Sequence, residues 1–132
     1  MQLSPFLRTV LKLDAASCLG LAALVLPTAG ALQQPLGIES WTLGAAAGLL
    51  VPIGLFILWL GTRREAAAIL VWLVIIGNFG WTAASLAVAA ELPGMTALGQ
   101  AAVAAQGLAV LALAFAEWLG LSRSRAATWE GA

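Results

Sequence analysis

The sequence contains no histidine and no tyrosine, and Cys18 is its only cysteine. A disulfide framework or a zinc site needs several such side chains, so neither can be assembled within one copy of the chain. Haem held through histidine is excluded for the same reason. With apolar residues around Cys18, no pairing of a nucleophile with a general base is visible. We therefore expect a protein that is not an enzyme and that carries no metal or other cofactor.

Charge is also scarce. Charged residues make up 9% of the 132 residues, and the net charge is zero. Six Lys and Arg side chains are too few to form the basic face that nucleic-acid binding requires. Hydrophobic residues make up 62% of the chain, whereas soluble domains average roughly 45–50%. The chain is long enough for about four membrane spans without a separate soluble domain. These features predict one all-α domain, an integral membrane four-helix bundle in the lipid bilayer.

The clearest span covers residues 66–90, which carry no charge and have Asn78 near their midpoint. In lipid only a helix or a closed barrel satisfies its own backbone polar groups, so this segment is expected to be a helix. The other expected spans are about 6–26, 41–60 and 95–121. The Thr62–Glu65 segment has the form of a capping box that opens the third helix. Tryptophans near the ends of two spans are expected interfacial anchors, namely Trp41, Trp59 and Trp118.

The first span also has features of a secretory signal peptide, with a basic start, an apolar run and Ala29-Gly30-Ala31 as a cleavage site. Asp14 would then interrupt the apolar run. An uncleaved first span is therefore the expectation.

The basic residues predict the orientation of the chain. In a four-span arrangement all of them fall on one side, namely Arg8, Lys12, Arg63, Arg64, Arg123 and Arg125. Basic residues near span ends favour the cytoplasmic side. This pattern predicts an up-down-up-down bundle in the bacterial inner membrane with both termini in the cytoplasm.

Four polar residues within the spans are candidates for an intramembrane site: Asp14, Asn78, Gln106 and Glu117. Asp14 lies about two helical turns inside its span, where it is either a proton or cation relay or a boundary carboxylate paired with Arg63 or Arg64. We favour the boundary interpretation. Glu117, beside Trp118, is interpreted in the same way. Asn78 and Gln106 are expected at similar depth, where a hydrogen bond between them would hold the third and fourth spans together.

Small residues mark two faces suited to close helix packing. Gly44 and Gly48 form a GxxxG pattern on the second span, and the fourth span repeats alanine at Ala97, Ala101 and Ala105. Packing within the bundle and packing against another membrane protein are both compatible with these patterns.

The segments Leu7–Gly20 and Val71–Ser85 resemble small four-span bacterial membrane proteins that have no assigned activity. That resemblance implies a four-helix membrane fold and no particular site. The chain is also similar in size and span count to the small multidrug resistance transporters, in which Asp14 would correspond to the substrate-coupling glutamate. It differs from them in having no tyrosine, in carrying Asp as the acid, and in its one-sided basic residues.

The first functional hypothesis is a non-catalytic accessory or scaffold subunit that packs against a larger membrane complex, of the respiratory or photosynthetic kind. The alternative is a small oligomeric transporter that is coupled to a proton or cation through Asp14. In both cases the expected partners are lipid and other transmembrane helices.

Overall fold

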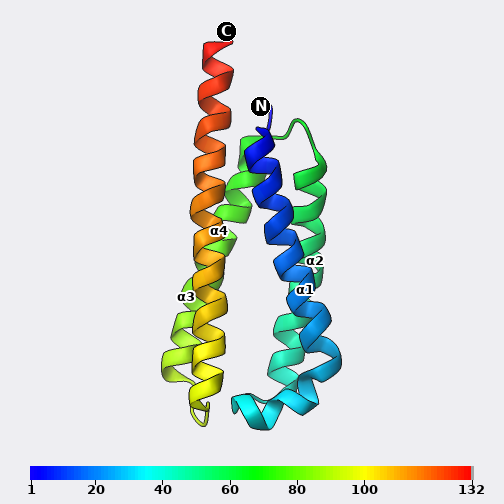
Figure 1. Ribbon diagram of the computed structural model, residues 1–132, viewed down its shortest axis with the longest axis vertical. Helices are drawn as coiled ribbons and strands as arrows, with labels where there is room; N and C mark the ends of the chain where they lie inside the picture. The colour runs from blue at the N-terminus through cyan, green and yellow to red at the C-terminus, as the bar shows by residue number, and fades with distance from the viewer. Residues whose placement is uncertain (132) are drawn as a thin grey trace.

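The computed structural model describes residues 1–131 as four helices, shown in Figure 1. Their bounds are α1 Pro5–Leu36, α2 Ser40–Thr62, α3 Ala68–Glu91 and α4 Ala97–Glu130. Each helix is long and apolar enough to cross a membrane, as in a multi-pass membrane protein. The prediction of an all-α four-helix protein is confirmed.

Helix α1 is longer than the expected span of residues 6–26, because it continues through Pro27 and Pro35 to Leu36. Proline removes one backbone hydrogen bond, but in an apolar chain the remaining amides still find their best partners within the helix. The part beyond Pro27, drawn in cyan, runs across one end of the bundle (Figure 1). The helix ends at Gly37, which has the left-handed φ of 67° and donates its amide to the Gln33 carbonyl at 2.9 Å.

Helix α4 is also longer than expected. Residues 122–130, which lie beyond the expected span of 95–121, continue the helix and extend beyond the other three helices (Figure 1). Its 34 residues exceed the length needed to cross a hydrocarbon core of ~30 Å. Alanine and arginine are good helix formers, so the last part needs no lipid to stay helical.

The capping box expected at Thr62–Glu65 does not form. Helix α3 begins after Ala67, which makes no side-chain cap, and Glu65 instead pairs with Gln2 in an isolated antiparallel bridge. The Leu3 amide donates to the Arg64 carbonyl at 2.8 Å, and the Ala66 amide donates to the Met1 carbonyl at 3.1 Å. The start of the chain therefore covers the connection between α2 and α3. This long-range pairing cannot be inferred from the local sequence of the connection.

The helices form two closely packed pairs. Helix α1 packs along α2 and α3 packs along α4, whereas α2 and α3 touch at only a few positions (Figure 1). Contacts between α1 and α4 join the two pairs. All four helices contribute to a buried apolar cluster whose largest members are Leu7, Leu11, Ile57, Leu60, Val71, Ile75 and Leu121. Many large apolar side chains remain exposed around it, as expected for helices that face lipid.

Helices approach each other closely at small residues, but these are not the small residues that the sequence indicated. A Cβ atom added at Gly120 would lie 2.9 Å from the Leu7 Cβ, so the α1–α4 contact depends on glycine there. Gly44 and Gly48 face open space, and the expected alanines on α4 are exposed, namely Ala97, Ala101 and Ala105. Of the two alternatives left open by the sequence, these faces do not pack within the bundle, and packing against a partner stays a prediction.

Gly120→Ala should lower the thermal stability of the protein in mild detergent by an amount equivalent to ~1–3 kcal/mol, because the new methyl group overpacks the contact with Leu7. Gly48→Ala is the matched control, since its methyl group meets no neighbour. Thermal unfolding followed by circular dichroism measures both variants. Equal midpoints for the two would contradict the close α1–α4 contact.

Candidate functional site

Three polar side chains from three helices meet in the interior of the protein. Asp14 of α1 and Glu117 of α4 are completely buried, and Asn78 of α3 is 7% exposed. The Asn78 Nδ2 atom donates to Asp14 Oδ2 at 2.8 Å and to Glu117 Oε2 at 3.0 Å. We call these three residues the carboxyl cluster. The amide nitrogen thus bridges two acids that lie 103 positions apart in the chain.

Helical periodicity places each member of the cluster inside. On α1 the inward residues Leu7, Leu11, Asp14 and Cys18 recur at intervals of three and four, which is one face of a helix. On α4 the inward face carries Glu117 between Ala114 and Gly120. Because the residues on either side of Glu117 on this face are small, α4 can lie close to α1 and α3.

Within residues 1–131 no basic side chain is paired with either acid. The Arg63 guanidinium instead lies 4.7 Å from the centre of the Trp59 ring, where a cation–π contact holds it at the end of α2. The expected pairing of Asp14 with Arg63 or Arg64 is therefore wrong, since Arg64 is exposed and engaged through its backbone by Leu3.

Two further atoms complete the surroundings of the cluster. The Cys18 thiol lies 3.9 Å from Asp14 Oδ1 as a weak donor, so this cysteine is more than an apolar packing residue. Glu117 Oε1 is buried and has no hydrogen-bond partner among the described residues. The cluster therefore has one more buried acceptor than its protein donors satisfy.

Glu117 is the residue whose role sequence reasoning missed most clearly. It was expected to reach the membrane surface beside Trp118, yet it is completely buried while Trp118 is 46% exposed. One signal was available. Asp14 lies six residues after Arg8, and Glu117 lies six residues before Arg123, which places the two acids at similar depth below one charged end.

Gln106 belongs to a second polar group and does not reach Asn78. Its Oε1 accepts from the Trp81 indole at 2.9 Å, and its Nε2 donates to Ser85 Oγ at 2.7 Å. The expected Asn78–Gln106 bond is therefore wrong, because both ends of the Gln106 amide are engaged by other groups. Gln106 still joins α3 to α4, as expected of polar residues that link helices in membranes.

The three expected interfacial tryptophans all lie on the outer surface. Trp41 is 70% exposed, and its indole donates to the Glu39 carboxylate at the start of α2. Trp59 stacks on Phe56 at the opposite end of that helix. Their places near the two ends of α2 fit the interfacial role, which stays a prediction for these residues and for Trp118.

Comparison with protein-family models, curated protein sequences and solved structures finds no match to this chain.

Double-mutant cycles should separate the two polar groups. Asn78→Leu combined with Glu117→Met should be non-additive in free energy of unfolding by ~0.5–3 kcal/mol, because the two side chains share a hydrogen bond. Asn78→Leu combined with Gln106→Leu should add within ~0.5 kcal/mol. Unfolding in mild detergent with increasing denaturing detergent measures both cycles, and strong coupling in the second cycle alone would contradict the observed partners.

Proposed function

We propose that this protein is a small proton-coupled membrane transporter whose proton-binding site is the carboxyl cluster. The observation that carries the proposal is the burial of Asp14 and Glu117 against one amide, with no basic side chain at either acid among the described residues. Intramembrane acids that face the interior of a helical bundle are characteristic of proton and ion pathways.

The energetics of burial favour a bound proton over two bare carboxylates. A buried carboxylate without a counter-ion is strongly disfavoured, and two carboxylates at one amide also repel each other. A proton shared within the pair removes one negative charge and supplies a donor. The unpartnered Glu117 Oε1 is an acceptor that such a donor would satisfy. A small monovalent cation is the alternative occupant.

The position of the cluster relates proton binding to movement. Asp14 belongs to the α1–α2 pair, whereas Asn78 and Glu117 belong to the α3–α4 pair. Because α2 and α3 touch at few positions, relative movement of the two pairs disturbs little else on that side. Loss or gain of the proton changes the charge at the junction between the pairs, and this change is the proposed coupling step.

The proposed orientation follows from the basic residues. Met1–Ser4, the connection between α2 and α3, and Ser124 of α4 contact one another at one end of the protein. All six basic residues lie toward that end or on the adjoining part of their helices. We therefore propose an up-down-up-down arrangement in a bacterial inner membrane, with this end and both termini in the cytoplasm.

Infrared spectroscopy tests for the shared proton. At neutral pH the wild-type protein should show the carbonyl stretch of a protonated, hydrogen-bonded carboxyl, and the combined variant Asp14→Asn with Glu117→Gln should lose it. Glu91→Gln is the control, because Glu91 is exposed at the end of α3. The same variants are then compared in proteoliposomes under an imposed pH gradient. The combined variant should show only the background proton leak, and the Glu91→Gln control should keep the proton flux of the wild type. A spectrum with only ionised carboxylates would overturn the proposal.

A second proposal is that the protein serves as an accessory subunit of a larger membrane complex. Its support is the GxxxG face of α2, since Gly44 and Gly48 face open space and leave room for a helix of another chain. The same face also suits association between copies of this chain, as expected of a small transporter.

Substitution of that face should separate these possibilities. Gly44→Leu with Gly48→Leu should abolish association in mild detergent, because the bulkier side chains keep a partner helix away. Gly30→Leu is the control, since Gly30 also faces open space but lies on α1. Cross-linking followed by mass spectrometry identifies the partner. A stoichiometric complex with other proteins supports the accessory subunit, and a homo-oligomer supports the transporter.

A further inference from the structure

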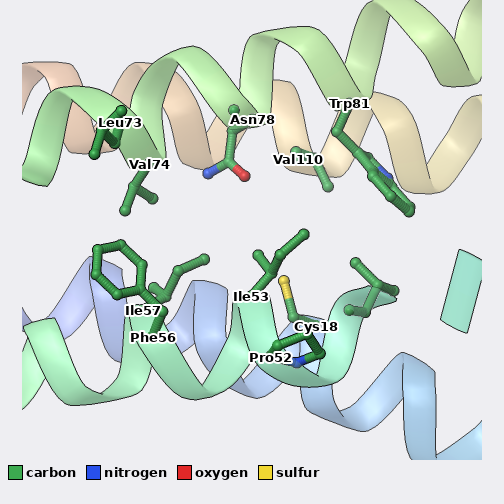
Figure 2. A pocket seen from close by; sticks show the side chains of 12 residues that line it. Cys18, Pro52, Ile53, Phe56, Ile57, Leu73, Val74, Asn78, Trp81 and Val110 are labelled. Atoms are coloured by element: carbon green, nitrogen blue, oxygen red, sulfur yellow. The ribbon is translucent and has the colours of Figure 1, made fainter. Parts of the chain in front are cut away.

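A cavity of about 390 Å³ lies between α2 and α3 and reaches inward to α1 and α4. Figure 2 shows side chains of α3 facing those of α2 across it, with Cys18 of α1 at its inner side. Its lining is apolar except for Asn78 and Cys18, and the larger members are Phe56, Leu73 and Trp81. The volume is within the range of sites that hold small molecules.

A second cavity of about 300 Å³ lies farther along the same side of the bundle. Leu50 and Trp81 line both cavities, so the two are neighbours that share a wall. The second cavity is lined mainly by aliphatic side chains, among them Leu21, Leu43 and Val103. Together they offer an apolar space that extends on both sides of Leu50 and Trp81.

Asn78 supplies an unsatisfied acceptor to the first cavity. Its Nδ2 donates to both acids of the carboxyl cluster, and this fixes which way the amide faces. Its Oδ1 accepts no hydrogen bond from any of residues 1–131, and Figure 2 shows the amide directed toward the cavity. A reversed amide would place its oxygen against the carboxyl oxygens. The free acceptor therefore stays on the cavity side, where leaving it unpaired is costly.

We propose that the two cavities bind a neutral, membrane-soluble molecule that has one hydroxyl head and a hydrocarbon chain. The hydroxyl donates to Asn78 Oδ1 in the first cavity, and the chain passes Trp81 into the second. A neutral head fits better than a cationic one, because neither Asp14 nor Glu117 lines the cavity. This inference rests on the free Oδ1 and the two cavities, and it does not require proton transport.

Tryptophan quenching tests the site directly. A variant that retains only Trp81 is made by replacing the other five tryptophans with phenylalanine, namely Trp41, Trp59, Trp72, Trp118 and Trp129. In detergent micelles, 12-bromododecan-1-ol should quench Trp81 saturably. Its methyl ether has the same chain and no donor, and it should bind about tenfold more weakly, as expected for the loss of one buried hydrogen bond.

Two glycines of α3 provide matched variants. Gly77 lines the first cavity, Gly80 lines neither cavity, and a Cβ atom at either position meets no neighbour. Gly77→Leu should therefore fill the cavity and abolish saturable quenching, while Gly80→Leu should leave it unchanged.

Three outcomes would overturn the inference. Equal affinity for the alcohol and the ether would show that the space takes ordinary lipid chains, and absence of saturable quenching would show that it binds neither probe. Equal effects of Gly77→Leu and Gly80→Leu would place the binding elsewhere. None of these results depends on the protonated-carboxyl band, so failure here and failure of the proposed transport function are distinguishable.

Discussion

The interaction on which the interior depends is the pair of hydrogen bonds from the Asn78 amide to Asp14 and Glu117. Two acids buried without a basic partner are a costly arrangement, and one amide nitrogen is the donor that both share. Helices α1, α3 and α4 must keep their register for these bonds to form, because a shift of one residue would turn an acid toward the apolar exterior. The cluster therefore specifies how the helices are aligned as well as which side chains they bury.

The bundle is divided into two helix pairs, and the carboxyl cluster lies where the two pairs meet. Within each pair, consecutive helices pack along their length, whereas the pairs meet through α1 and α4 and barely through α2 and α3. Apolar contacts around Leu7 and Gly120 hold the junction near one end. The polar contacts of Asp14 lie on the same junction, so a change in its charge acts where the two pairs are joined.

Four apolar helices and the inward face of α3 could be predicted from the sequence, because uninterrupted apolar length and three-to-four spacing are local signals. The true ends of α1 and α4 could not, since Pro27 and the polar residues after Leu121 usually mark a helix end, and here the backbone stays helical. For the candidate site, burial of Asn78 could be anticipated from its place within a span, whereas Asp14 was interpreted as a boundary carboxylate and is completely buried. The choice of partners could not be anticipated. Glu117 and Gln106 both lie on α4, the helix that packs along α3. Only the register of α3 against α4 decides which of the two Asn78 contacts.

Asn78 also connects the two sites proposed here, because its amide nitrogen belongs to the carboxyl cluster and its side chain lines the first cavity. The nitrogen is held by the acids, and this leaves the oxygen directed at the apolar cavity between α2 and α3. A molecule that donates to the oxygen polarises the same amide and strengthens its donation to the acids. If both proposals hold, protonation of the cluster and occupation of the cavity are linked through this one side chain, and by reciprocity each alters the affinity of the other.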